Sequence, residues 1–348
     1  MEIGRRRFLA LGAAATAAAR VRAQSLAVKR AAKKTGSRPV MEPVQADAIE
    51  AAIATLERTG MRDGAARSGA LDIVQREIDR MGYCGDWSWL SMLGESTPAA
   101  KAEKFRAEYP VLRWLDDSFE RVLREFRETM ISGPAPAIWY VYNMGIVVKT
   151  ATCAFSIDLK HRHARRFAPL LDFALVSHNH GDHFSDGFLA DMAGAGKPVI
   201  TNFRLVPGWY CREFDKTFKI KDVTVRCTAA DHNKGLPWAV NNYEVACGDG
   251  PGAFRLFHSG DCCRADHLKP SAPPDVFFGH CAIGLDFEAA AATTMPAKLI
   301  VPLHHQELGH LKGPWRCVAY KDEPLKIVSR LVKNGFDSAM PVWGDRIV

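Results

Sequence analysis

Hydrophobic positions recur at helical spacing in four segments between residues 46 and 130. The stripes of the first, second and fourth segments are Ile49, Ile53 and Leu56; Leu71, Val74, Ile78 and Met81; and Leu112, Leu115, Phe119, Val122 and Phe126. Gly60 and Gly82 follow the first two stripes, and the third segment opens with Ser96-Thr97-Pro98, a cap residue followed by proline in the first turn. We therefore predict an all-helical N-terminal region over residues 44–132.

The pattern changes after Ser132-Gly133-Pro134-Ala135-Pro136 to short runs of β-branched and aromatic residues. The runs that we predict as strands are 138–142, 145–150, 153–159, 173–177, 198–201, 217–229, 242–247, 254–258 and 298–303. Helical pieces interrupt these runs at about 186–193 and 287–294. We therefore predict a layered α/β fold for this part of the chain rather than an all-β fold.

The positive charge of the chain is concentrated at its N-terminus. The 348 residues carry a formal net charge of +7, and 47% of them are apolar, which excludes a collagen-like or wholly disordered chain. Residues 1–38 contain ten Lys or Arg and one Glu, which leaves 36 basic and 38 acidic residues in the rest. Because the remainder is nearly neutral, we expect no nucleic-acid partner.

The first 23 residues have the layout of an export signal. A basic start is followed by twelve mildly apolar residues and by Val21-Arg22-Ala23, a small-x-small cleavage site. The run Arg5-Arg6-Arg7-Phe8-Leu9 resembles the twin-arginine signal. Twelve residues are too few for a hydrocarbon core that needs about 20. The alternative is a basic amphipathic leader or a disordered tail.

These features predict a twin-arginine signal peptide over residues 1–23 and a basic linker over 24–43. The resemblance implies a periplasmic protein that uses the twin-arginine export machinery as a partner. Its mature form is expected to have no stable membrane span, because no other segment approaches transmembrane length. The oligomeric state is left open.

A compact set of metal-ligand residue types follows the predicted strand 173–177. In His178-Asn179-His180-Gly181-Asp182-His183, the first two histidines are two positions apart and leave an extended backbone on the same side. Gly181 allows a turn, after which Asp182 and His183 can face a second position, roughly 3.5 to 4 Å away as in two-metal sites. The further candidates at strand ends are His232, Asp261 and His304, with the adjacent His305 as an alternative to His304.

This His-x-His-x-Asp-His run, followed by a His, a Gly-Asp and a final His, resembles the metallo-β-lactamase superfamily. The ending Val301-Pro302-Leu303-His304, after Asp275-Val276 and Glu288-Ala289-Ala290, is similar to the branch of the L-ascorbate-6-phosphate lactonase and the N-acylphosphatidylethanolamine phospholipase D. The resemblance implies an αββα metallo-β-lactamase sandwich over residues 137–348, which the all-helical region precedes. It implies a metal-dependent hydrolase.

The family pattern also implies two divalent metal ions, with Zn expected and Mn or Fe as alternatives. The implied ligands are His178, His180 and His232 for one ion, Asp182, His183 and His304 for the other, and Asp261 as the bridge. Two cations that share a water lower its pKa from about 15.7 toward 7, which provides a hydroxide nucleophile. The family pattern makes Asp182 the catalytic residue that orients this hydroxide. The expected substrate is a small or lipid-like phosphodiester, lactone or ester.

Three other functions remain as alternatives: a β-lactamase-type amide hydrolase, an iron-dependent oxidoreductase, and a non-catalytic metal-binding protein of the same fold. The oxidoreductase is disfavoured because a flavin-partnered di-iron site resembles His-x-Glu-x-Asp-His, whereas this chain has His180 at the second position.

Residues near the motifs leave further interpretations open. Cys262 and Cys263 either pack in the core or react near the metals. The cations that either contact an anionic substrate or are solvated are Lys234, Lys312 and Arg316. The tryptophans that either form a lid or belong to the helical core are Trp87 and Trp89. The candidates for protonating the leaving group are His258, His280, His305 and His310.

Overall fold

The structure, a computed structural model, describes most of the chain after residue 43. The described residues are 44–84, 95, 97–203, 215–233, 235–281, 283–294, 296–308 and 318–348. The sequence predictions that lie outside them concern the signal and linker (1–43), Trp87, Trp89, Lys234, His310, Lys312 and Arg316.

Two β-sheets form the centre of the molecule. The strands of the first sheet, in spatial order, are β1 (Ala137–Tyr142), β2 (Gly145–Lys149), β3 (Ala154–Ile157), β4 (Phe173–Val176) and β5 (Val199–Thr201). Those of the second, also in spatial order, are β11 (Leu299–Leu303), β10 (Val276–His280), β9 (Phe254–His258), β8 (Val240–Cys247), β7 (Val223–Ala230) and β6 (Lys216–Ile220). The runs β3-β4-β5 and β9-β10-β11 are parallel, and the other neighbours are antiparallel.

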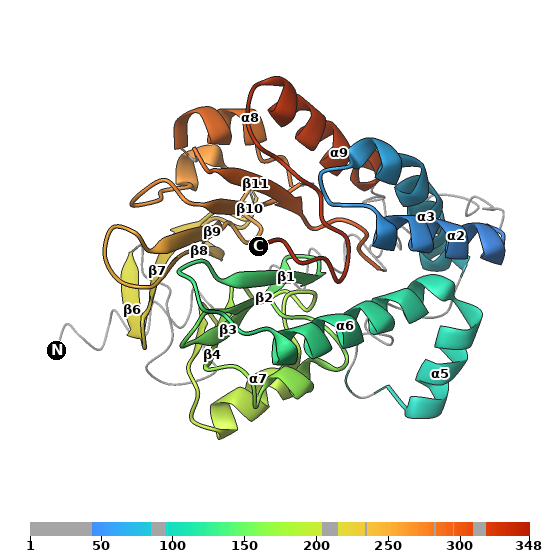
Figure 1. The fold of residues 1–348 in the computed structure, drawn as a ribbon, viewed down its shortest axis with the longest axis horizontal. Helices are drawn as coiled ribbons and strands as arrows, with labels where there is room; N and C mark the ends of the chain where they lie inside the picture. The colour runs from blue at the N-terminus through green and yellow to red at the C-terminus, as the bar shows by residue number, and fades with distance from the viewer. Residues whose placement is uncertain are drawn as a thin grey trace.

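Helices cover the outer faces of the two sheets (Figure 1). On the first sheet these are α6 (Pro110–Glu128) and α7 (Asp186–Gly194), and on the second α8 (Phe287–Ala289) and α9 (Val318–Lys333). The remaining helices of the described residues are α2 (Ala46–Arg58), α3 (Gly64–Cys84), α5 (Ala99–Glu108) and the short η1 (Ala164–Phe167), η2 (Ala265–His267) and η3 (Ala290–Thr294). This arrangement confirms the predicted layered α/β sandwich after an all-helical region. Among the described helices, none combines the length and apolar character that a bilayer crossing requires.

The apolar stripes of the helical region are buried as the sequence predicts. The stripe of α6 packs into the same hydrophobic core as both sheets. Gly82, however, does not end α3, which continues to Cys84. The predicted single strand 217–229 is wrong, because Lys221 has φ 52° and turns the chain between β6 and β7. The hydrophobic pattern also missed β10 and α9.

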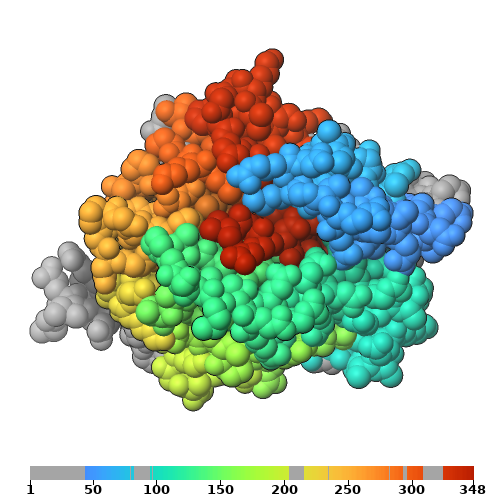
Figure 2. Space-filling model, viewed as in Figure 1, coloured from blue at the N-terminus to red at the C-terminus, as the bar shows by residue number. Residues whose placement is uncertain are grey.

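The C-terminal segment 337–348 links the edges of the two sheets. It pairs with β1 through Ile138, whose carbonyl accepts from Ile347 N at 2.7 Å, and with β11 through a bridge between Ser338 and Ile300. Figure 2 shows this segment, in dark red, enclosed between the blue residues of the N-terminal region and the green residues that follow them in the chain. The last residues of the chain are therefore part of the sandwich.

A buried arginine attaches the helical region to this C-terminal segment. Arg67 of α3 is 1% exposed and donates to Asp345 Oδ2 at 2.7 Å and to the Met340 carbonyl at 3.0 Å. Its guanidinium also bonds to the carbonyls of Leu56 and Thr59 at the end of α2. Because a buried cation requires this set of acceptors, Arg67 fixes the end of α2 against the end of the chain.

A second connection joins the helical region to the loop 158–163 after β3. The carboxylate of Asp116, in α6, lies 2.8 Å from Arg162 Nη2 and 3.3 Å from His161 Nε2. The same loop bonds to the chain that follows β4, because Ser185 Oγ donates to the His161 carbonyl at 2.9 Å. The helical region therefore supports a loop that reaches the edge of the first sheet.

We predict that Arg67→Met lowers the free energy of unfolding by about 3 to 5 kcal/mol, because it leaves buried acceptors without their cation. Arg62→Met is the matched control: Arg62 also pairs with the C-terminal segment, through Asp337 at 2.7 Å, but is 57% exposed. This change is expected to cost under about 1 kcal/mol. Urea unfolding of both variants measures the difference, and equal costs would contradict the role given to Arg67.

Candidate metal centre

The histidine-rich loop 177–183 begins where the buried strand β4 ends. Tyr243, on the second sheet, donates its hydroxyl proton to the Val176 carbonyl at 2.7 Å, and Asn241 N donates to the Ser177 carbonyl at 2.8 Å. These bonds hold the end of β4 against the second sheet. The loop is thereby presented at the edge where the ends of β7, β9 and β11 also lie.

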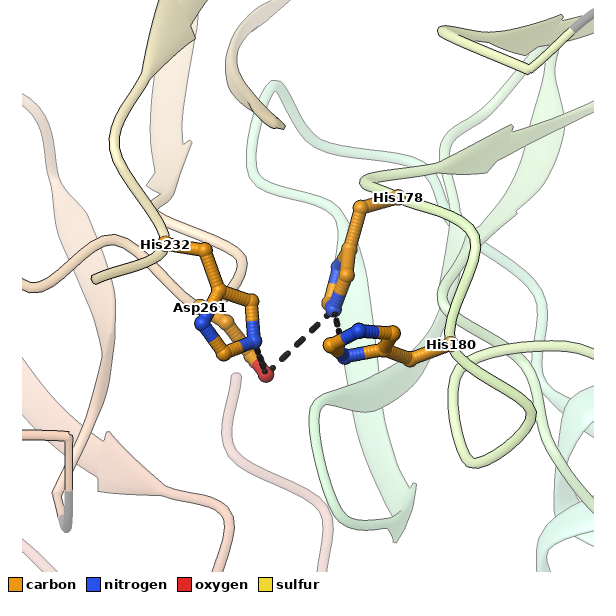
Figure 3. A group of neighbouring side chains, drawn as sticks. All are labelled: His178, His180, His232 and Asp261. Atoms are coloured by element: carbon orange, nitrogen blue, oxygen red, sulfur yellow. Dashed lines mark hydrogen bonds and ion pairs between the residues drawn. The ribbon is translucent and has the colours of Figure 1, made fainter. Parts of the chain in front are cut away.

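The first group of candidate ligands consists of His178, His180, His232 and Asp261. One donor atom from each lies within 4.8 Å of the others. Asp261 Oδ2 is 3.4 Å from His178 Nε2 and 3.3 Å from His232 Nε2, and His178 Nε2 is 2.8 Å from His180 Nδ1. Figure 3 shows the four side chains pointing toward a common centre.

The second group consists of Asp182, His183 and His304, again with donor atoms within 4.8 Å of one another. Asp182 Oδ2 is 3.5 Å from His183 Nε2 and 3.2 Å from His304 Nε2. The other oxygen of Asp261, Oδ1, is 3.2 Å from His183 Nε2 and 4.0 Å from His304 Nε2. Asp261 therefore presents one carboxylate oxygen to each group, which is the geometry of a bridging ligand.

The structure brings together all seven residues that the sequence singled out. It also distinguishes between the two adjacent histidines after β11. His304 belongs to the second group, whereas His305 is buried with its ring 5.5 Å from that of Tyr140. Burial lowers the pKa of His305 to about 3. His304 is therefore the residue that faces the centre.

Gly260 allows Asp261 to reach its position. It has φ 49°, and a Cβ atom there would lie 2.6 Å from Ser177 Cβ and 2.7 Å from Val240 Cγ1. His258 supports the same turn, because its Nδ1 accepts from Gly260 N at 3.1 Å while its Nε2 donates to the Met144 carbonyl at 2.8 Å. These partners define a neutral tautomer and give His258 a structural role rather than an acid role.

Asp158 is a functional residue that the sequence analysis missed, because it was included in a predicted strand. Its buried carboxylate accepts from His183 Nδ1 at 2.9 Å and from the backbone N and the Oγ of Ser177, both at 2.7 Å. A carboxylate on the far nitrogen of a histidine orients the ring for metal binding. The parallel pairing of β3 and β4 was the signal that could have found it, because their carboxyl ends share one edge.

Asn143, in the turn between β1 and β2, was also missed. Its Nδ2 donates to Asp182 Oδ2 at 3.3 Å, and its carbonyl accepts from His304 N at 3.0 Å. Asn143 and His304 both have positive φ, at 52° and 67°. The Asn143 side chain and carbonyl therefore hold two members of the second group in place.

The charges of the centre fit a bound cation. Burial alone would raise the pKa of Asp182 and of Asp261, but the effects of His183 and of the other nearby histidines together outweigh it and hold both pKa values well below the usual range. Burial lowers the pKa of His180 to about 3 and also lowers that of His178. The first group therefore combines an ionised carboxylate with the neutral imidazoles of His178 and His180, a donor set that divalent transition metals prefer.

Three buried polar atoms of the centre also fit a bound cation. Within the described residues, His183 Nε2, His232 Nε2 and Asp261 Oδ1 form no hydrogen bond. Buried polar atoms normally have a partner. The protonated His183 supplies the positive charge that Asp158, Asp182 and Asp261 require, since these carboxylates raise its pKa well above the usual value despite burial. A divalent ion would supply that charge in its place.

The cysteines after Asp261 are not among the candidate ligand groups of the described residues. Cys262 is buried, and its Sγ lies 3.3 Å from the Arg264 carbonyl. Burial raises the pKa of Cys262 to about 12 and also raises the pKa of Cys263. Both thiols therefore stay protonated near neutral pH, which favours packing over reactivity.

No family model and no curated protein matches this chain. Its matches among solved structures include Igni18, a metallo hydrolase from Ignicoccus hospitalis, at 16% identity and TM-score 0.46, covering 61% of this chain and 97% of that chain. Another is a Zn-dependent hydrolase of the metallo-β-lactamase superfamily from Thermotoga maritima, at 16% identity and TM-score 0.35, covering 57% and 86%. A third is the diiron β-hydroxylase CmlA from Streptomyces venezuelae, at 11% identity and TM-score 0.41, covering 61% of this chain and 53% of CmlA.

We predict that Asp158→Asn weakens metal binding at the group of Asp182, His183 and His304 by about 10 to 100-fold, because the amide no longer fixes the His183 ring. Titration of the variant and of wild type with Co(II), followed by its absorption spectrum and by calorimetry, measures this difference in affinity. The control is Asp191→Asn, which removes an equal charge from an exposed pair with Arg165. Unchanged affinity in Asp158→Asn would contradict this role.

Proposed function

We propose that this protein is a metal-dependent hydrolase of the metallo-β-lactamase type that works with two divalent ions. The observation that carries the proposal is Asp261, whose two oxygens face two separate groups of histidines. Zn is the expected ion, because three of the four donors in the first group are imidazoles. Asp182 and Asp261 give the second group more negative charge, so Mn or Fe also fits there.

When bound, such a pair of ions acidifies water and polarises an oxygen of the substrate. The chain contributes positioning and charge around this step. Asp182 lies between Asn143 Nδ2 at 3.3 Å and His304 Nε2 at 3.2 Å, so its carboxylate is held in one orientation. Its remaining electron pairs can accept a hydrogen bond from the attacking water or hydroxide and orient it. The groups it bonds with are themselves buried, which strengthens these interactions.

We infer that the substrate is a phosphodiester, or a lactone or ester, of small-molecule or lipid-like character. This inference rests on the similarity of Val301-Pro302-Leu303-His304 to the lactonase and phospholipase D branch. This motif includes the last residues of β11, and His304, which follows the strand, belongs to the second group. A β-lactamase activity is the alternative outcome of the substrate test, because the same centre can attack an amide carbonyl.

The protein reconstituted with Zn or Mn is expected to hydrolyse bis-p-nitrophenyl phosphate or a member of a lactone panel, and to hydrolyse nitrocefin poorly. Chelation with 1,10-phenanthroline should lower this turnover to background, and added metal should restore it. Preferential hydrolysis of nitrocefin would favour the amide hydrolase. The hydrolase proposal fails if none of the three substrate types turns over at two ions per chain.

We further propose that the protein is periplasmic and is exported by the twin-arginine machinery, on the basis of Arg5-Arg6-Arg7-Phe8-Leu9. Replacing Arg5 and Arg6 by Lys is expected to leave the precursor uncleaved in the cytoplasm. The control replaces Arg30 and Arg38 by Lys, an equal change beyond the cleavage site. Cell fractionation and N-terminal sequencing measure the outcome, with a mature start near Gln24 expected. Processing of the Arg5/Arg6 variant like the control would refute this route.

A further inference from the structure

Asp158 carries the carboxylate that orients His183, yet its own backbone is strained. It has φ 50°, a left-handed conformation that is uncommon for a residue with a side chain. Such a conformation persists where the surrounding structure fixes the residue from both sides. β3 precedes Asp158 and holds it on one side, and its carboxylate accepts from Ser177 N at 2.7 Å. The rest of the loop 158–163 therefore has to hold it on the other side.

The inner side of this loop bonds to the chain directly after the histidine-rich loop. Lys160 Nζ donates to the Phe184 carbonyl at 3.0 Å. Ser185 Oγ donates to the His161 carbonyl at 2.9 Å and accepts from His161 N at 3.3 Å. Since Asp158 bonds to the start of the histidine-rich loop, the loop 158–163 holds both ends of it.

The outer side of the same loop is held by α6 of the helical region. Asp116 Oδ2 accepts from Arg162 Nε at 3.1 Å and from Arg162 Nη2 at 2.8 Å. His161 Nδ1 accepts from His163 N at 3.1 Å, so the proton of the neutral ring is on Nε2. This Nε2 lies 3.3 Å from Asp116 Oδ1. The His161 ring also stacks on Phe119 of α6, with the centroids 4.0 Å apart and the planes within 6° of parallel.

Asp116 is a buried and ionised anchor for these contacts. It is 2% exposed, and Arg106 of α5 donates to its Oδ2 at 2.9 Å. Burial alone would raise the pKa of this carboxyl, but its interactions with His161 and Arg162 hold the pKa well below the usual value. A buried polar network in which the charge has several donors is rigid. The helical region thus presents a fixed point to the loop 158–163.

We propose that Asp116 is a positioning residue for the metal centre, which holds the loop 158–163 so that Asp158 keeps the His183 ring in the orientation that binds a divalent ion. Asp116 belongs to none of the candidate ligand groups of the described residues, and it acts through Asp158. This inference rests on the metal centre of the proposed function. It gives the helical region, which the family resemblance does not cover, a share in metal affinity.

The test is a double-mutant cycle on Co(II) affinity, measured by calorimetry and by the Co(II) absorption spectrum. Asp116→Asn, which removes the charge at nearly constant size, is expected to lower the affinity by about 3 to 30-fold. In an Asp158→Asn background, the same change is expected to lower it by less than about twofold, because the connection through Asp158 is already broken. A merely structural role of Asp116 would lower the free energy of unfolding without this dependence on Asp158.

The matched control is Asp117→Asn, because Asp117 is the next carboxylate of α6, pairs with the same Arg106 at 3.2 Å and is 54% exposed. It should leave Co(II) affinity unchanged. Arg162→Lys is the second variant if Asp116→Asn does not fold. It keeps the cation but loses the paired geometry of the guanidinium, and it is expected to lower the affinity in the same Asp158-dependent way. Urea unfolding without metal shows that each variant is folded when it is titrated.

Unchanged Co(II) affinity in the folded variants, or an equal loss in both backgrounds, would overturn the inference and leave the metal centre intact. If wild type binds no Co(II), the metal centre of the proposed function fails and the inference fails with it. The measured quantity is metal affinity, so the result is separate from the test of hydrolase activity.

Discussion

The burial of the Asp261 carboxylate between two groups of histidines is the constraint on which the rest of the centre depends. A buried carboxylate is costly unless positive charge and hydrogen-bond donors surround it. Asp261 has imidazole nitrogens of His178 and His232 beside one oxygen and the protonated His183 beside the other. The fold therefore has to bring all the residues of the centre into contact with one another.

The fold meets this requirement by collecting strand ends at one edge. The ends of β4 and of β7, β9 and β11 carry the candidate ligands, although these residues are far apart in the sequence. The helical region supports the centre indirectly. Asp116 of this region pairs with Arg162 in the loop 158–163, and the same loop contains Asp158, which bonds to His183. The C-terminal segment joins the two sheets, and Arg67 attaches α2 and α3 to it. Parts of the chain that the family resemblance does not cover thus support the geometry of the centre.

The sequence predicts the fold and the candidate site to different extents. Spacing alone indicates His178, His180, Asp182 and His183, because these residues are local and directly follow an apolar strand. Asp158 and Asn143 act through contacts over 25 and 39 positions, which no local pattern contains. His304 and His305 could not be separated by sequence, since a positive φ at His304 decides which ring faces inward. The turn at Lys221 was missed because a left-handed lysine has no compositional signal.

We propose a single centre in which Asp261 bridges two ions. Anomalous diffraction from a crystal of the Zn-loaded protein, recorded at the Zn absorption edge, measures whether this bridge exists. Two peaks are expected roughly 3.5 to 4 Å apart, one within bonding distance of each Asp261 oxygen. A single peak, or a second peak that does not contact Asp261, would contradict it.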